Sequence, residues 1–299
     1  MTGTPTFAIA GGFLGVTRRD PDAAAVIAGV PFDIATTNRP GARFGPEAIR
    51  RASRMLVDGD HPTQRRDLTG KLADIGDFEI ALGDVAASLE LIERQAAPIR
   101  HLVTLGGDHA IALPLLRARA RRHGPVGVVH FDAHVDTWPD SFGQPYGHGS
   151  VFYHAIREGL VDPRRMIQVG IRSPVQKEVL DWTLQQGVSI VSAQEVHEQG
   201  VARIVERIRA VLGSEKTGGA AYLSFDIDAL DPAFAPGTGT PEIGGLATWQ
   251  AQALLRGLGG LNFVGMDMVE VAPVYDHAEI TALAAATLVY EYLALALPA

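Results

Sequence analysis

One short segment of the sequence places histidine and aspartate at every second position. Residues 130–137 read HFDAHVDT, so His130, Asp132, His134 and Asp136 alternate with apolar or small residues. In an extended strand successive side chains point to opposite faces, and these four would project from one side of the backbone. Hydrophobic burial does not account for such a face. The pattern instead indicates a functional site built from histidine and carboxylate side chains.

Side chains of the same types follow two other apolar runs. The run at 101–106 is followed by His109 in LGGDH. The run at 220–227 leads into SFDIDALD, with Asp226 and Asp228 two residues apart. Parallel sheets bind ligands beyond the carboxyl ends of their strands, so residues that follow three strands are expected to converge. The candidate metal ligands are His109, Asp132, His134, Asp136, Asp226 and Asp228.

A single buried Asp or His at a strand end is usually a hydrogen-bonded structural residue. Four clustered carboxylates favour another interpretation, because they repel one another and would take up protons unless cations neutralise them. Oxygen-rich ligation with some imidazole favours two Mn²⁺ ions over structural Zn²⁺, while Fe²⁺, Co²⁺, Ni²⁺ and Zn²⁺ remain chemically possible. Two such ions can lower the pKa of a shared water, which predicts a hydrolase.

The elements that must position these residues are short apolar runs that alternate with helix-length segments. Helices are expected at 46–53, with Pro46 and Glu47 in the first turn, and at 194–212. Near-continuous apolar strands joined by helices indicate an α/β fold of three layers (αβα), with a parallel sheet covered on both faces. Roughly eight strands are expected, at 24–30, 71–76, 101–106, 126–131, 165–171, 188–193, 220–227 and 262–268.

One domain spanning residues 1–299 is expected, because no charged linker, low-complexity stretch or repeat divides the chain. The segment GSEKTGG at 213–219 is expected to be a surface loop. A net charge of −8 argues against a nucleic-acid partner, since neutralising phosphates needs a basic surface. The chain has no cysteine, which excludes disulfides and thiolate metal sites.

The terminal segments predict neither export nor a membrane anchor. The first 20 residues have an apolar middle but no basic residue before it, unlike a signal peptide. The apolar run at 280–297 is rich in alanine and interrupted by Glu291, so a helix packed in the core is expected. A cytoplasmic protein without a membrane partner is therefore expected.

The chain resembles the ureohydrolase family, which includes arginases and agmatinases, and the likeness is strongest to agmatinases. GGDH alone is weakly specific, whereas a set of such blocks in order is highly specific. The resemblance covers nearly the whole chain and implies an arginase-like fold. Its blocks are GVPFDIATTNRPGARFGPEAIR at 29–50, GGDH at 106–109, HFDAHVDT, YGHGS at 146–150, SFDIDALDPAFAPGTGTPEIGG at 224–245, GMDMVEVAP at 265–273 and EITALAAAT at 279–287.

The resemblance implies two Mn²⁺ sites that share two bridging carboxylates, those of Asp132 and Asp226. It also implies attack of a metal-activated water on a guanidinium carbon, with release of urea and a primary amine. Each site would have one histidine and three aspartates. The two sets are His109, Asp132, Asp136 and Asp226, and Asp132, His134, Asp226 and Asp228.

Three catalytic roles also follow from the resemblance. Asp136 would relay a proton to the leaving amine, His148 would exchange protons with solvent, and Glu270 would hydrogen-bond the guanidinium. The structural alternatives are an ordinary loop histidine at His148 and a salt bridge at the sheet edge for Glu270. Asp231 and Asp267 are expected either to support the ligands by hydrogen bonds or to have purely structural roles.

The substrate implied is a small guanidino compound, with agmatine first, yielding urea and the polyamine putrescine. Arginases carry asparagine two residues after the last Asp of the DAH block, where this chain has Trp138. The loop 138–146 is expected to line the path of the distal amine. A guanidino acid such as 4-guanidinobutyrate is the alternative, and it would need a basic residue at the pocket mouth, for which Arg39 and Arg43 are candidates.

Two rivals lie outside the ureohydrolases. A zinc deacetylase of related fold would use one metal and a pair of adjacent histidines, whereas this chain has a second Asp-x-Asp block and no His-His pair. In a non-catalytic metal-binding or interaction module, some of the six ligand positions would be replaced by residues that do not bind metal, and all six are intact. The family resemblance further implies a homo-oligomer, a trimer or hexamer.

Overall fold

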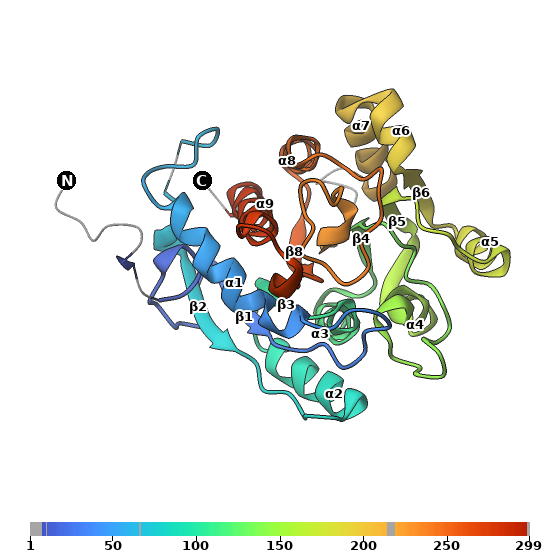
Figure 1. Cartoon of the computed structure of the whole chain (residues 1–299), viewed down its shortest axis with the longest axis horizontal. Coiled ribbons are helices and arrows are strands. Elements are labelled where there is room, and N and C mark those ends of the chain that lie inside the picture. Colours follow the sequence, from blue (N-terminus) through green and yellow to red (C-terminus); the bar gives the residue numbers. More distant parts are fainter. Residues whose placement is uncertain (1–7, 10, 66, 214–218, 298–299) are drawn as a thin grey trace.

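The computed structural model describes residues 8–9, 11–65, 67–213 and 219–297, and its centre is an eight-stranded parallel sheet (Figure 1). The strand order is β2-β1-β3-β8-β7-β4-β5-β6. All eight predicted strands are confirmed. They are β1 Ala25–Val30, β2 Leu72–Asp77, β3 Leu102–Gly106, β4 Val126–Phe131, β5 Val161–Ile171, β6 Ser189–Ser192, β7 Ala221–Asp226 and β8 Phe263–Val269.

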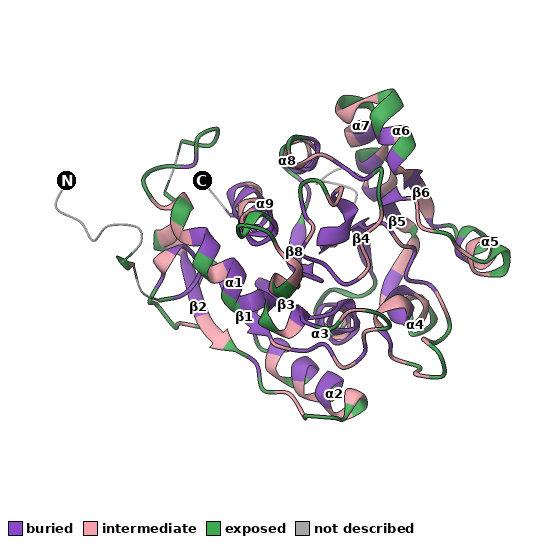
Figure 2. Ribbon diagram, viewed as in Figure 1, coloured by how far each residue is buried: buried purple, intermediate pink, exposed green. Residues whose placement is uncertain are grey.

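Helices cover both faces of this sheet, which confirms the three-layer αβα arrangement. One apolar core joins α1, α6, α7, α8 and α9 to one face, and a second core joins α2, α3 and α4 to the other. The purple strands between the helices in Figure 2 are buried. The helices are α1 Gly45–Ala52, α2 Val85–Ala96, α3 Ala112–His123, α4 Val151–Arg157, α5 Lys177–Gln186, α6 Ala193–Gln199, α7 Val201–Leu212, α8 Thr248–Arg256 and α9 Ile280–Ala296.

Burial along the strands explains the continuous apolar runs of the sequence. Every residue of β1, β3, β4, β7 and β8 is buried, because helices lie on both sides of these strands. The edge strands β2 and β6 contain partly exposed residues. The sequences of the central strands therefore indicate their position in the fold more clearly than those of the edge strands.

The single helix predicted at 194–212 is wrong, because the segment forms two helices, α6 and α7. Gly200 lies between them with φ of 78°, a backbone conformation that glycine adopts without a Cβ clash. The first predicted helix is confirmed as α1, which begins at Gly45 with Pro46 in its first turn. Five residues of the predicted loop at 213–219, residues 214–218, lie outside the described residues.

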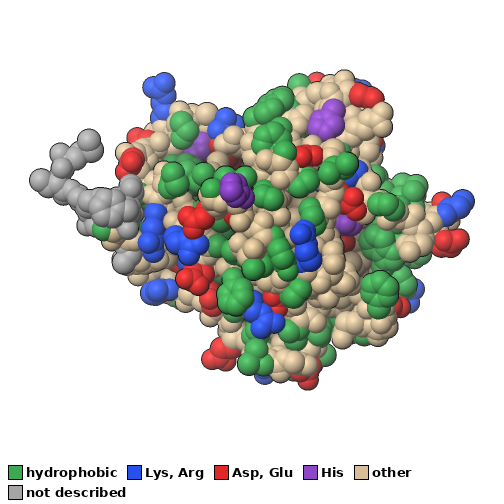
Figure 3. Space-filling model, in the orientation of Figure 1, with side chains coloured by type: hydrophobic (Ala, Val, Ile, Leu, Met, Phe, Trp, Pro, Cys, Tyr) green, Lys and Arg blue, Asp and Glu red, His purple; other side chains and the backbone are tan. Residues whose placement is uncertain are grey.

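The C-terminal apolar run forms α9, a helix buried in the core as predicted. Glu291, which interrupts the run, is buried but compensated, since it pairs with Arg256 and its Oε2 lies 3.3 Å from His61 Nε2. Within the described residues no helix is long and apolar enough to cross a membrane. On the face shown in Figure 3, acidic and basic side chains are interspersed.

Candidate metal centre and active site

Four neighbouring strands at the middle of the sheet supply the site. β3, β8, β7 and β4 are adjacent and parallel, so the segments that follow them meet at one edge. His109 opens a short 3-10 turn after β3, and Asp132 directly follows β4. Asp226 ends β7, and Glu270 directly follows β8. The predicted convergence of residues from separate strands is therefore present.

The alternation at 130–136 does not come from one continuous strand. β4 ends at Phe131, and the last backbone bonds to the β5 side are those from Asp132 N to Val169 O and from Arg172 N and Ser173 N to Ala133 O. The backbone then turns, because the Asp132 carboxylate accepts a hydrogen bond from His134 N at 2.6 Å. Asp136 has a left-handed φ of 49°. The expected extended face is thus wrong, although its side chains still meet.

The first half of the cluster consists of His109 and three carboxylates that surround it. Its Nδ1 lies 2.9 Å from Asp136 Oδ2, 3.3 Å from Asp132 Oδ2 and 3.4 Å from Asp226 Oδ2. This nitrogen is buried and has no hydrogen bond of suitable geometry. His109, Asp132 and Asp136, together with His130, form a group compact enough to hold a metal ion, and Asp226 lies beside this group.

The other ring nitrogen of His109 fixes its tautomer. Ser224 Oγ donates its only proton to Asp267 Oδ1 at 2.7 Å, so at 2.8 Å it accepts the proton of His109 Nε2. When the ring is neutral, Nδ1 therefore carries a lone pair that points at carboxylate oxygens. A cation between them would turn this repulsion into ligation. Asp267 supports His109 through Ser224, and Ser224 was not anticipated from the sequence.

His134 and Asp228 form the second half of the cluster. His134 Nδ1 lies 3.2 Å from Asp132 Oδ1 and 3.1 Å from Asp228 Oδ2. Asp132 therefore presents one oxygen to each histidine, as a bridging carboxylate would. Asp228 is oriented by Ala133 N at 3.0 Å and by Thr240 Oγ1 at 3.2 Å. These three side chains also form a group that could hold an ion.

The electrostatics of the site call for positive charge. Burial and repulsion from Asp228 and Asp132 raise the pKa of Asp226 well above its usual value. Burial lowers the pKa of His134, but Asp228 and Asp132 overcome this effect and raise it to about 12. Two divalent ions would neutralise the carboxylates and keep the histidines deprotonated. The donor set of imidazole nitrogens and carboxylate oxygens fits Mn²⁺.

His130 has a supporting position that the alternation did not reveal. Gln168 Nε2 donates to His130 Nδ1 at 3.1 Å, so His130 Nε2 carries a proton and donates to Asp132 Oδ2 at 2.7 Å. The His130 ring thus orients Asp132, even though it lies within the compact group of possible ligand atoms. Gln168 comes from β5, and no spacing in the sequence relates it to residue 130.

His148 and Glu270 contact each other beside the metal ligands. Their Nδ1 and Oε1 atoms are 3.0 Å apart, and Glu270 Oε1 also accepts from His109 N at 2.9 Å. Thr37 N donates to His148 Nε2 at 3.1 Å. Burial lowers the pKa of His148, but Glu270 raises it overall to about 9. Both predicted residues lie at the site, while their catalytic roles stay predictions.

Asp231 lies apart from the cluster and has a local role. Its carboxylate accepts from the backbone nitrogens of Ala233, Gly244 and Gly245 and holds together the loop after β7. The alternative that the sequence left open, a purely structural residue, describes this contact set. We find no hydrogen bond or ion pair between Asp231 and a predicted ligand among the described residues.

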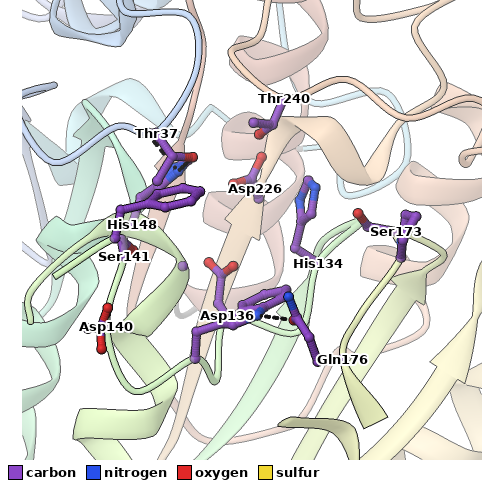
Figure 4. Close-up of a pocket in the computed structure, with 14 residues that line it drawn as sticks. Thr37, His134, Asp136, Asp140, Ser141, His148, Ser173, Gln176, Asp226 and Thr240 are labelled. Carbon is purple, nitrogen blue, oxygen red and sulfur yellow. Dashed lines mark hydrogen bonds between the residues drawn. The ribbon is translucent and has the colours of Figure 1, made fainter. Parts of the chain in front are cut away.

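A cavity of about 330 Å³ opens beside the cluster (Figure 4). Its wall includes Trp138, whose Nε1 donates to Gln176 Oε1 at 2.6 Å. Arg39 and Arg43 are not among the lining residues, since Arg39 donates to backbone oxygens and Arg43 pairs with Asp33. The lining residues, none of which is Lys or Arg, are Thr37, His134, Asp136, Trp138, Asp140, Ser141, Phe142, His148, Gly149, Ser173, Pro174, Gln176, Asp226 and Thr240.

The sequence is similar to proteins named agmatinase. One from Cronobacter sakazakii is 45% identical over 281 residues, which are 92% of this chain and 88% of that protein. Another from Salmonella paratyphi B is 46% identical over 281 residues, with the same coverage.

Two solved structures with similar sequences have the same fold as this chain. A hypothetical agmatinase from Burkholderia thailandensis has a TM-score of 0.90 at 43% identity, covering 97% of this chain and 91% of its own. Proclavaminate amidino hydrolase from Streptomyces clavuligerus has a TM-score of 0.91 at 38% identity, covering 98% and 99%. The model of the arginase family matches residues 23–294. The predicted ureohydrolase relationship is confirmed: the chain belongs to the arginase family of enzymes.

Proposed function

We propose that this enzyme hydrolyses agmatine to putrescine and urea with two bound Mn²⁺ ions. The observation that carries the proposal is the charge of the pocket. Beyond the predicted metal ligands His134, Asp136 and Asp226, its lining includes the carboxylate of Asp140 and neither Lys nor Arg. Agmatine is a dication near neutral pH, with a guanidinium at one end and an ammonium at the other, and therefore suits an acidic pocket.

The ions would be held by the six ligands predicted from the sequence. His109, Asp136 and Asp132 Oδ2 would serve one, and His134, Asp228 and Asp132 Oδ1 the other, as their contacts suggest. Asp226 Oδ2 lies 3.4 Å from His109 Nδ1, and its Oδ1 accepts from Asp228 N. When bound, such ions polarise the substrate and lower the pKa of an attacking water.

The protein would bind and orient the guanidinium and move protons. Glu270 Oε1 is held by two donors, whereas no hydrogen bond to its Oε2 is made by the described residues. Oε2 is thus free to accept from a planar guanidinium. Asp136 lies on both the cavity wall and the metal cluster, which suits a proton relay to the leaving amine.

His148 would connect this site with solvent. Its Nδ1 faces the buried Glu270, and its Nε2 faces Thr37, which is exposed. Because Thr37 N donates to Nε2, the neutral ring carries its proton on Nδ1 and donates to Glu270. The two nitrogens therefore reach from the interior to the surface, as a proton shuttle requires.

A guanidino acid is the second candidate. It is favoured by the likeness to proclavaminate amidino hydrolase, whose name denotes a carboxylate substrate. The pocket argues against it, because a substrate carboxylate would meet the carboxylate of Asp140 without a Lys or Arg partner in the lining. The deacetylase and the non-catalytic module are both disfavoured by the family match and the intact ligand set.

The test is urea release by Mn²⁺-loaded protein from agmatine, arginine, 4-guanidinobutyrate and 3-guanidinopropionate, with metal-free protein as the control. We expect strong preference for agmatine and no urea without metal. Equal turnover of arginine, or preference for a guanidino acid, would refute the proposed substrate. Full activity in metal-free protein would refute the metal requirement.

A further inference from the structure

A tight hairpin borders the pocket at residues 141–144. Ser141 N donates to Gln144 O at 2.8 Å, and Gln144 N donates to Ser141 O at 3.0 Å. The two tip residues, Phe142 and Gly143, have positive φ values of 53° and 86°. Phe142 is also 96% exposed. A bulky apolar residue in this conformation and exposure is uncommon, and here it lines the pocket.

Asp140, the residue before this hairpin, also lines the pocket. Its Oδ1 accepts from Gly143 N at 2.8 Å and so fixes the orientation of the carboxylate. Among the described residues no Lys, Arg or His pairs with Asp140, and its Oδ2 accepts no hydrogen bond. The pocket therefore offers an oriented carboxylate oxygen without a partner in the protein.

The lining separates into a polar cluster and an aromatic part. His134, Asp136 and Asp226 are shared between the lining and the metal ligands. Trp138 and Phe142 supply rings, and Trp138 is held in place by Gln176. In the view of Figure 4, Asp140 and Ser141 lie on one side of the pocket and Ser173 and Gln176 on the other. An apolar chain would fit against the rings, with a charged group at Asp140.

We propose that Asp140 is a specificity-determining residue that binds the distal ammonium of the substrate, while Trp138 and Phe142 contact its methylene chain. This inference rests on the proposed function and assigns the substrate's second charge to a named carboxylate. An ammonium donates three hydrogen bonds and requires no planar partner, so one carboxylate oxygen of a lining residue without a partner in the protein is a sufficient anchor. The same oxygen would repel a guanidino acid.

The test compares Asp140→Asn with wild type on agmatine and on n-butylguanidine, which has no distal charge. Asparagine keeps an oxygen that accepts from Gly143 N, so the hairpin is preserved. Since an exposed charge pair contributes up to about 1 kcal/mol, we expect KM for agmatine to rise about threefold to fivefold while kcat changes less than about twofold. KM for n-butylguanidine should stay unchanged. Asp140→Glu should keep KM for agmatine closer to wild type than Asp140→Asn does.

Asp162→Asn is the matched control. Asp162 lies near the start of β5, at the opposite edge of the sheet, and its Oδ1 similarly accepts from Arg164 N at 3.1 Å. This variant loses the same charge and should leave both KM values unchanged. Agmatine hydrolysis with a KM insensitive to Asp140→Asn, or an equal rise for both substrates, would overturn the role of Asp140 alone. Wild-type preference for 4-guanidinobutyrate over agmatine would overturn the proposed function and this role together.

Discussion

Asp132→Asn should remove both metal ions, because one carboxylate faces both halves of the cluster. Its Oδ2 lies 3.3 Å from His109 Nδ1 and its Oδ1 lies 3.2 Å from His134 Nδ1. Asparagine keeps the shape but removes both charged oxygens: one becomes an amide nitrogen that does not bind metal, and the other becomes a neutral amide oxygen, which is a weaker ligand. Losing a hydrogen bond to a ligand already weakens metal affinity about 10–100-fold. Losing the ligand itself should cost at least about 100-fold per ion, or about 2.7 kcal/mol each.

The measurement is metal content by plasma mass spectrometry after gel filtration in metal-free buffer, with urea release measured in parallel. We expect two ions per chain in wild type, fewer than one in Asp132→Asn, and one in Asp228→Asn, because Asp228 approaches only His134 among the two ligand histidines. Asp231→Asn is the control and should keep both ions, since Asp231 binds loop nitrogens only. Equal losses in Asp132→Asn and Asp228→Asn, or two ions in Asp132→Asn, would refute the sharing of Asp132.

Three further changes test the supporting contacts. Ser224→Ala should weaken metal affinity about 10–100-fold by releasing His109 Nε2, as a Mn²⁺ titration would measure, and unchanged affinity would contradict the tautomer argument. Because Glu270 raises the pKa of His148 to about 9, protonated His148 stabilises the metal-free fold fully below its unfolded pKa of 6.5 and loses this effect as the pH rises through 9. The difference in unfolding free energy between metal-free wild type and His148→Asn, from urea denaturation, should therefore shrink between pH 6.5 and 9, and a constant difference would exclude this titration. Gly200→Ala should cost about 1 kcal/mol of unfolding free energy, because φ is 78° there although no atom lies within 4 Å of the added Cβ, and an unchanged or raised melting temperature would contradict the requirement for a left-handed glycine.

The strands were predictable because burial on both faces leaves an uninterrupted apolar run. Seven of the eight begin within one residue of the expected position, and β5 begins at Val161 instead of residue 165. Residues 162–165 of β5 are partly or fully exposed and mostly polar, so hydrophobicity does not reveal where this strand begins. The break at Gly200 was missed for a related reason, since apolar residues at helical spacing continue on both sides of it.

The clustering of the candidate metal ligands was predictable because several carboxylates and histidines follow separate buried strands, whereas a single one is usually structural. Their supports were not predictable, since a hydrogen bond in space leaves no spacing in the sequence. Ser224 reaches His109 across 115 positions, and Thr37 reaches His148 across 111. Such partners become visible only when strand order brings the segments together. The hairpin at 141–144 was hidden for another reason, because phenylalanine is not a usual residue for a positive φ.

The alternation at 130–136 identified side chains that do cluster, but through the wrong geometry. In a straight strand, Asp132 and Asp136 would be about 14 Å apart, because each residue adds about 3.4 Å. Ligands of one ion each lie about 2.1 Å from it, so a straight strand would keep these two carboxylates from sharing a site. The structure brings both within 3.3 Å of His109 Nδ1 by ending β4 at Phe131 and turning at Asp132. The hydrogen bond from His134 N to Asp132 makes that turn, so the carboxylate proposed to bridge the ions also folds the loop that carries His134 and Asp136. A substitution at Asp132 should accordingly disturb Asp136 more than one at Asp228 does.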